Sequence, residues 1–158
     1  MDASPLISCL KVGRFDLLGA LSRPVVCVRE VRAEILHFAQ NQSIEPLIAG
    51  GRLAECAPAG VNCLADYAAL RGARPGLGAG ECASIIYAAH VNAPLVVDDR
   101  SAANEARRRG ITCITTAEVV VLNIQRGRLT VAEADGLIRA WAALGEIITR
   151  AASFGELL

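Results

Sequence analysis

The sequence predicts an α/β fold in which short parallel strands alternate with longer helices. The runs at Val25–Val28 and 111–114 are four residues long, apolar and largely β-branched, which is typical of buried strands. Stretches rich in Ala and Leu, with apolar residues at helical spacing, separate such runs. Because the connections are short and helices follow strands, we expect parallel pairing and a sandwich of helices around a sheet.

Local signals predict each element in turn. Ser4 before Pro5 predicts a helix with Ser4 as its N-cap and Pro5 at its first position. Gly110 predicts a helix end, and Thr130 with Glu133 forms a capping box. The other expected helices are 15–21, 29–40, 63–71, 81–90, 101–109, 116–125 and 130–143. The expected strands are 25–28, 94–97 and 111–114. A further short strand is expected near 53–56, inside a loop-rich stretch at 41–59. The 158 residues suit one domain, and no linker or repeat is visible, so we expect a single domain over 1–158.

The composition excludes several classes of protein. Sixteen basic and sixteen acidic residues give a net charge of zero, which excludes a polycation that holds nucleic acid by bulk charge. No apolar run approaches the roughly 20 residues of a membrane span, and the first residues lack the basic and apolar regions of a signal peptide. We therefore expect a cytoplasmic protein without a membrane partner.

The six cysteines are expected to be free. No pair has the CxxC spacing of a zinc or redox motif, and most lie in apolar stretches such as Val25–Val28. A buried free cysteine behaves as a small apolar side chain. We expect neither disulfides nor zinc.

Several chemistries lack the residues that they need. A phosphoacceptor receiver domain and a haloacid-dehalogenase-like phosphatase both pair an aspartate with a lysine late in the chain, whereas Lys11 is the only lysine here. The glycines at 76–80 do not form a phosphate-loop motif. His37 and His90 lie in expected helices without a GxSxG motif, so serine or cysteine hydrolase chemistry is not indicated.

Acidic residues stand where the predicted strands end or the next helix begins. Asp98 and Asp99 follow the strand at 94–97, Glu81 opens a helix after a glycine-rich turn, Glu34 lies in the helix after Val25–Val28, and Asp2 precedes the first helix. In open α/β sheets, ligands gather at the carboxyl ends of the strands. Such acids could share one Mg²⁺, which prefers oxygen ligands. Taken singly, each has an ordinary role as a helix-terminal or solvated acid.

Asp98 and Asp99 are expected to differ in role. Successive residues leaving a strand point to opposite faces, so only one carboxylate can face a metal in good geometry. We expect Asp98 to be the ligand because it directly ends the strand. Asp99 would then cap the next helix or hold a metal-bound water.

Four motifs in order resemble PIN-domain nucleases. Asp2 to Ile7 reads D-A-S-P-L-I and resembles the D-x-S-P-L-I opening of that family. A short strand and V-x-x-E ending at Glu34 follow, then L-G-A-G-E-C-A around Glu81, and L-V-V-D-D-R-x-A around Asp98. The chain resembles the PIN-like branch related to VapC-type toxins over nearly its whole length.

The resemblance implies a three-layer sandwich with a central parallel sheet and helices on both faces. It also implies a ribonuclease that uses Mg²⁺ or Mn²⁺ to activate water, and it makes a toxin of a toxin–antitoxin pair the expected function. Family members are commonly homodimers that an antitoxin protein holds inactive. The implied catalytic and metal-binding residues are Asp2, Glu34, Glu81 and Asp98, with Asp99 as a further metal ligand and Ser4 in support.

The chain departs from the family pattern at three places. Only Met1 precedes Asp2, where the family has an apolar first strand, so we expect this strand to be truncated. Ala103 stands where the family often has arginine, and 115–118 replaces a G-T-x-G sequence. A PIN fold that has lost catalysis and serves as an RNA-binding or protein-interaction module is therefore the alternative hypothesis.

Overall fold

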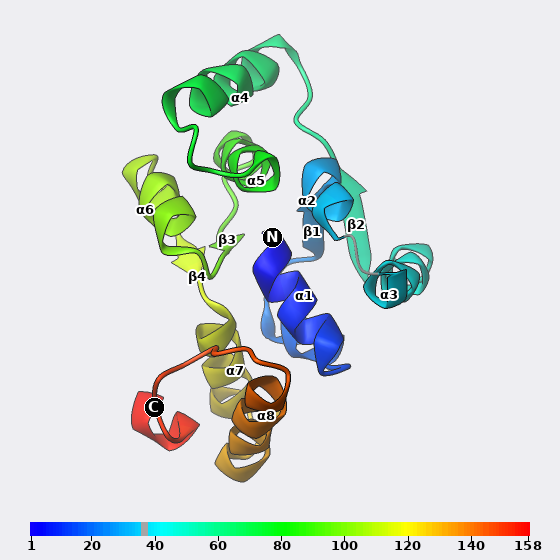
Figure 1. The fold of residues 1–158 in the computed structure, drawn as a ribbon, viewed down its shortest axis with the longest axis vertical. Helices are drawn as coiled ribbons and strands as arrows, with labels where there is room; N and C mark the ends of the chain where they lie inside the picture. The colour runs from blue at the N-terminus through cyan, green and yellow to red at the C-terminus, as the bar shows by residue number, and fades with distance from the viewer. Residues whose placement is uncertain (36–37) are drawn as a thin grey trace.

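The computed structural model describes the backbone of residues 1–35 and 38–158, and the side chains of all of these except 38–42. Helices predominate in it, and four short strands are present (Figure 1). The first half comprises α1 (Ala3–Lys11), the 3₁₀ helix η1 (Phe15–Ala20), β1 (Val25–Val28), α2 (Arg29–Glu34), α3 (Phe38–Ala49), β2 (Leu53–Cys56) and α4 (Val61–Ala73). The second half comprises α5 (Ala79–His90), β3 (Leu95–Val96), α6 (Arg100–Arg108), β4 (Cys113–Ile114), α7 (Thr116–Gln125), α8 (Val131–Ala143) and η2 (Phe154–Leu157).

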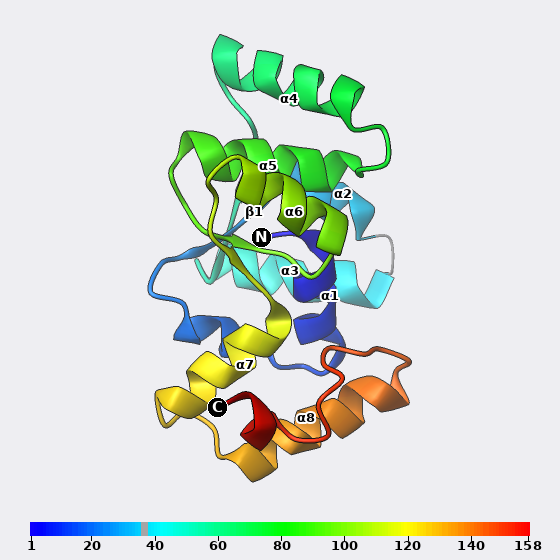
Figure 2. The ribbon, with the colours of Figure 1, turned by 90° about the vertical axis from the view of Figure 1, so that its left-hand side faces the viewer.

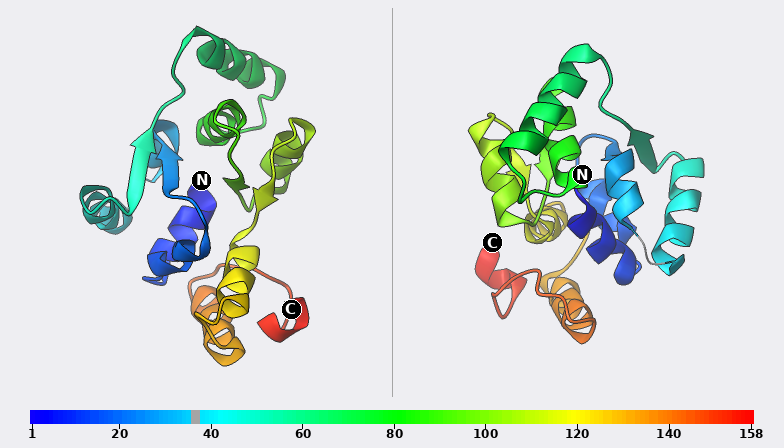
Figure 3. Two further views of the ribbon diagram at one scale, coloured as in Figure 1. Left: turned by 180° about the vertical axis from the view of Figure 1, so that it is seen from behind. Right: turned by 45° about the horizontal axis from the view of Figure 1, so that its top comes forward.

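The strands form two parallel pairs. β1 pairs with β2, with Val25 opposite Leu53, and β3 pairs with β4, with Leu95 opposite Cys113. Figure 3 shows the two pairs on either side of the chain start. The mixed α/β class and the parallel pairing are therefore confirmed. A single central sheet with helices on both faces is not confirmed, because the described strands form separate two-stranded sheets.

The first two residues lie between the two sheets. The amino group of Met1 donates a hydrogen bond to the carbonyl oxygen of Val26 in β1 at 2.8 Å. The N–H of Asp2 donates to the carbonyl oxygen of Val96 in β3 at 3.0 Å. Met1 and Asp2 thus bridge β1 and β3 directly before α1 begins.

Two apolar clusters hold these elements together. The larger one joins α1, η1, β1, α7 and α8, and it includes the fully buried Leu6, Trp141 and Phe154. The second joins α5, α6 and the β3–β4 pair around Ile85 and Leu95. In Figure 2, α7 and α8 lie at one end of the molecule and α4 at the other, with α5 and α6 next to α4.

Local capping signals set several helix ends as expected. Asp99 caps α6, where its carboxylate accepts a hydrogen bond from the N–H of Ala102 at 2.8 Å. Thr130 and Glu133 form the predicted capping box of α8. The predicted N-cap at Ser4 is wrong: α1 begins at Ala3, because the N–H of Asp2 is tied to β3 and the chain turns into the helix directly after it.

The expected helix at 29–40 is wrong in its extent. α2 ends at Glu34, and a separate helix α3 runs to Ala49 through Pro46, inside the stretch expected to be loop-rich. Ile44 and Leu47 of α3 are buried in the larger cluster, so packing outweighs the hydrogen bond that a proline costs a helix. His37 lies outside the described residues. No described helix is long and apolar enough to cross a membrane.

Candidate acidic site

Three acidic side chains lie within one another's electrostatic influence where α1, α2 and α5 meet. Asp2 directly precedes α1, Glu34 ends α2, and Glu81 lies in the first turn of α5. Glu34 Oε1 accepts a hydrogen bond from the N–H of Gly80 at 2.8 Å. Glu81 Oε2 accepts one from the N–H of Gly78 at 2.7 Å. The N-terminal turn of α5 thus positions both glutamates, and its dipole favours the negative charge.

Gly80 makes the approach of Glu34 possible. A Cβ atom at this position would lie 2.8 Å from Glu34 Oε2 and 2.9 Å from its carboxyl carbon, which is closer than real contacts allow. At Gly78 the nearest carboxylate oxygen would be 3.4 Å from such a Cβ, which is close to ordinary contact. The position of Glu34 against α5 therefore depends on the absence of a side chain at Gly80.

Asp2 is the buried member of the site. Its side chain is only 2% exposed, and no hydrogen bond reaches Oδ1 within the described residues. Burial raises the pKa of Asp2 to about 6, and the negative charges of Glu81 and Glu34 add to this rise. A hydrogen bond from the backbone of Ala3 and the Met1 ammonium group act in the opposite direction.

Burial and two neighbouring acids act on the pKa of Glu81. Burial raises the pKa of Glu81, and the charges of Asp99 and Glu34 raise it further, against the hydrogen bond from Gly78. The acids whose charges act on one another at this site are therefore Asp2, Glu34, Glu81 and Asp99. Like charges gathered in this way favour either protonation or a bound cation.

Asp98 has different neighbours. Its carboxylate accepts hydrogen bonds from the N–H of Thr116 at 2.8 Å and from the Thr116 hydroxyl at 2.6 Å. Burial raises the pKa of Asp98, and the acids whose charges add to this rise are Glu146 and Glu118. The carboxylate of Asp98 thus ties the end of β3 to the start of α7, whereas that of Asp99 lies in the field of Glu81.

Ser4 lies on the side of Asp98. Together with Asp98, Lys11 and Glu146, it lines a hollow of about 520 Å³. Lys11 Nζ forms an ion pair with Glu146 at 2.5 Å, so the only lysine is neutralised there.

The donor chemistry of the site fits a hard divalent cation. Carboxylate oxygens are the ligands that Mg²⁺ and Mn²⁺ prefer, and a buried carboxylate oxygen without a hydrogen bond is costly unless a cation or a proton meets it. Asp2 Oδ1 is such an atom. Within residues 1–35 and 38–158, however, no three His, Cys, Asp or Glu side chains are already arranged as a metal site.

Sequence reasoning missed two residues that position the acids. The G-A-G-E sequence was excluded as a phosphate loop and matched to the family through Glu81, but a glycine just before an acid at a helix start also permits close approach of another side chain, as at Gly80. Thr116, 1% exposed, lies in the segment 115–118 that was noted only as a departure from the family pattern, because its bond to Asp98 depends on β3 and α7 meeting. All six cysteines are free in the structure.

These features define a small α/β protein with an acidic site built from the starts and ends of several helices. Residues 1–145 match the family DUF3368, a PIN domain. The match covers most of the chain, which therefore belongs to this PIN-domain family. PIN domains are generally nucleases. Comparison with curated proteins and with solved structures finds no match.

Proposed function

We propose that the protein is a metal-dependent endoribonuclease that hydrolyses RNA phosphodiester bonds at the acidic site. The observation that carries this proposal is the buried Oδ1 of Asp2, which lacks a hydrogen bond and lies in the field of Glu34 and Glu81. Membership of the PIN family supports the nuclease class. Such an oxygen among like charges is costly unless a proton or a cation meets it, and the acidic neighbours favour a cation as its partner.

Asp2, Glu34 and Glu81 would hold Mg²⁺ or Mn²⁺. When bound, such an ion supplies a water of lowered pKa and neutralises charge on the scissile phosphate. Glu34 and Glu81 each place one carboxylate oxygen on a backbone N–H of the α5 start, which fixes their orientation. A carboxylate of the site that is not fully engaged can orient the attacking water or accept its proton.

Asp99 is the better candidate for the fourth acid. It lies in the field of Glu81, and its cap on α6 fixes its orientation. The contacts of Asp98 with Thr116 favour a positioning role instead, in which it anchors β3 to α7. This reverses the order expected from the sequence, where Asp98 was the preferred ligand.

The first test is RNA cleavage by the purified protein. A long labelled RNA is expected to be cut in Mg²⁺ or Mn²⁺ and left intact in chelator. Glu81→Gln is expected to lose cleavage while α5 stays capped, because glutamine also completes a capping box. If the wild-type protein cleaves no RNA in either Mg²⁺ or Mn²⁺, the proposal is refuted.

A matched glycine pair tests the position of Glu34. Gly80→Ala is expected to displace the Glu34 carboxylate and lower cleavage at least tenfold, whereas Gly78→Ala has nearly enough room and serves as the control. Alanine is the better helix residue by up to about 1 kcal/mol, and urea unfolding of both variants checks that the clash with Glu34 does not unfold Gly80→Ala. Equal cleavage by both variants would remove Glu34 from the proposed site.

The free energy of unfolding measures metal binding independently of RNA cleavage. An ion that binds only the folded protein raises the free energy of unfolding by about 2.7 kcal/mol at a hundred times its Kd. Mg²⁺ is expected to stabilise the wild type in urea and to have no such effect on Asp2→Asn. Equal stabilisation of both proteins would place the ion elsewhere.

We further propose that this ribonuclease is the cytoplasmic toxin of a toxin–antitoxin pair and acts as a homodimer. The resemblance of its motifs to VapC-type toxins supports this role. Induced expression in a bacterial host is expected to arrest growth, and Glu81→Gln is expected to remove the arrest. Sedimentation of the purified protein as a monomer would refute the dimer.

A module without catalysis is the second candidate. It is favoured by one observation: the acids in the described ranges are not already arranged as a metal site. In that case RNA would be bound but not cut, and Mg²⁺ would not stabilise the wild type. Cleavage that depends on Glu81 would exclude it.

A further inference from the structure

Four arginines gather where the end of α4 meets α6. Arg71 and Arg74 lie three positions apart at the end of α4, and Arg108 and Arg109 are neighbours at the end of α6. Glu105 of α6 pairs with three of them. Its carboxylate lies 3.0 Å from Nε of Arg109, 3.5 Å from Nη1 of Arg108 and 3.6 Å from Nε of Arg74. We call the four arginine side chains the arginine patch.

The arginine patch carries a net positive charge. Four positive charges against the one carboxylate of Glu105 leave a charge of +3. Each guanidinium group has five N–H donors, whereas a carboxylate accepts at about four sites. Glu105 therefore cannot engage most of these donors, and the side chain of Arg108 is 64% exposed. The patch is accessible to a ligand that brings several anionic oxygens.

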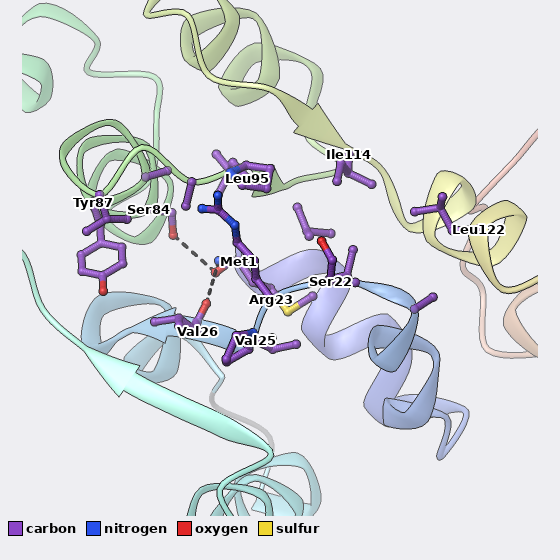
Figure 4. Close-up of a pocket in the computed structure, with 18 of the residues that line it drawn as sticks. Met1, Ser22, Arg23, Val25, Val26, Ser84, Tyr87, Leu95, Ile114 and Leu122 are labelled. Atoms are coloured by element: carbon purple, nitrogen blue, oxygen red, sulfur yellow. Dashed lines mark hydrogen bonds between the residues drawn. The ribbon is translucent and has the colours of Figure 1, made fainter. Parts of the chain in front are cut away.

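Other arginines of the protein have different surroundings. Arg29 and Arg32 of α2 pair with two glutamates, so their cluster is neutral. Arg23 lies against an apolar cavity of about 420 Å³, where it donates to the carbonyl oxygen of Asn92 at 3.2 Å (Figure 4). An excess of positive charge from neighbouring arginines therefore distinguishes the arginine patch from both places.

The arginine patch adjoins the acidic site. Arg71 Nη1 donates to the carbonyl oxygen of Leu77 at 2.6 Å, and the N–H of the next residue donates to Glu81. Helix α6 begins directly after Asp99, and Glu105 lies six positions further, about 9 Å along the helix axis. An anionic chain that has one phosphate at the acidic site therefore reaches the patch with its neighbouring phosphates.

Helix stability accounts for only part of the arginine patch. Basic side chains at a helix C-terminus offset the helix dipole, which explains Arg108 and Arg109 at the end of α6. Arg74, however, reaches Glu105 from the end of α4. An ion pair with an arginine as exposed as Arg108 contributes only about 0–1 kcal/mol. Stability therefore does not require three arginines on one carboxylate.

We propose that the arginine patch binds the phosphodiester backbone of the RNA strand that is cleaved at the acidic site, an inference that rests on the ribonuclease function proposed above. Arginine binds phosphate oxygens through paired N–H donors, and its planar group also stacks on unpaired bases. Such contacts hold a single strand with little preference for its sequence. The arginine patch thus positions the strand, and the acidic site cuts it.

RNA binding in chelator tests the patch in the absence of cleavage. The anisotropy of a fluorescent single-stranded RNA gives Kd at several KCl concentrations. Each phosphate contact contributes about 0.7 to the slope of the logarithm of affinity against the logarithm of salt concentration. Arg108→Gln is expected to weaken binding about threefold or more and to lower this slope by about 0.7. Arg29→Gln is the matched control and is expected to change neither, because Arg29 is 74% exposed and also pairs with a glutamate. Equal Kd and slope for the wild type and Arg108→Gln would overturn the proposal.

Removal of the negative charge of Glu105 changes the patch in the opposite direction. Glu105→Gln leaves the arginines in place and raises the charge of the patch, so RNA is expected to bind about threefold or more tightly at low salt. Arginines that serve only the packing of α4 against α6 would give no such gain. Urea unfolding checks that the variant folds. If folded Glu105→Gln binds RNA no more tightly than the wild type, the patch is not the RNA-binding surface.

Cleavage kinetics in Mg²⁺ separate failure of this inference from failure of the proposed function. Arg108→Gln is expected to raise KM for RNA with little effect on kcat, because the patch lies away from the reacting phosphate. If the wild type cleaves RNA and Arg108→Gln has the same KM, the patch is refuted and the ribonuclease function stands. If the wild type cleaves no RNA but Arg108→Gln weakens RNA binding, the ribonuclease function is refuted and the binding surface stands. Binding of anionic lipid vesicles without binding of RNA would overturn the proposed surface.

Discussion

Replacing Asp2 with asparagine is expected to change how the stability of the protein depends on pH. Asp2 is 2% exposed, and burial raises its pKa from 3.8 to about 6. Between these two values the folded protein binds a proton at Asp2 and the unfolded chain does not. The contribution of Asp2 therefore stabilises the protein at low pH and is lost as pH rises through about 6.

The size of the effect follows from the two pKa values. One pKa unit corresponds to about 1.4 kcal/mol, so the rise to about 6 corresponds to roughly 3 kcal/mol. Asparagine removes this dependence, although its buried amide imposes a fixed cost of about 1–3 kcal/mol. Relative to the wild type, Asp2→Asn should gain up to about 3 kcal/mol between about pH 4 and pH 7.

Urea unfolding of both proteins in chelator, at several pH values across this window, measures the effect. The Met1 amino group also titrates, and burial lowers its pKa, so acid destabilises the protein through Met1 in both variants. The charge of Asp2 raises the pKa of Met1, so the two groups titrate as a coupled pair and the difference between the two proteins reports that pair. Asp16→Asn is the control, because Arg14 lowers the pKa of Asp16 and the sign of its pH dependence is opposite.

A constant stability difference between wild type and Asp2→Asn over this window would refute the argument. It would mean that the carboxyl group of Asp2 is as well solvated in the folded protein as in the unfolded chain. The proposed cation site would then lose the observation on which it rests.

Four further substitutions test the surroundings of the site and the packing of the helices. Asp99→Asn is expected to lower RNA cleavage at least tenfold with little loss of stability, because asparagine caps a helix as well as aspartate does. Asp98→Asn is expected to keep cleavage and lose stability in urea, and the opposite ranking in single-turnover assays would make Asp98 the metal ligand. Thr116→Val removes the hydroxyl that donates to Asp98 and should cost about 1–2 kcal/mol in urea unfolding. Trp141→Phe leaves the carbonyl of Ser8 without its 2.9 Å hydrogen bond and should cost about 1–3 kcal/mol, whereas an unchanged urea midpoint would show that this bond does not stabilise α8 against α1.

The parts of the fold that follow from neighbouring residues were predictable from the sequence. Helix α7 at Thr116–Gln125 has the expected bounds, and the cap at Asp99 is one of the two roles expected for that residue, because both features depend on residues within one helical turn. The continuation of α3 through Pro46 was not predictable, since it depends on burial of Ile44 by distant elements.

The candidate site was predictable only in part. The sequence singled out Asp2, Glu34 and Glu81 through their places at element ends, and the structure puts them in one another's electrostatic field. Which of the two adjacent aspartates faces them depends on how β3 meets α6 and α7. Such a tertiary contact leaves no local signal in the chain.

The hydrogen bond between Asp2 and Val96 has a consequence for synthesis of the protein. Its two partners are 94 positions apart, so it cannot form until β3 has been translated. At about 5–20 residues per second, Asp2 waits at least several seconds for this partner. Glu81 and Asp99 also lie in the later part of the chain, so the acidic site cannot assemble on a short nascent chain. A ribosome that makes this protein is therefore not exposed to its completed site until most of the chain has been made.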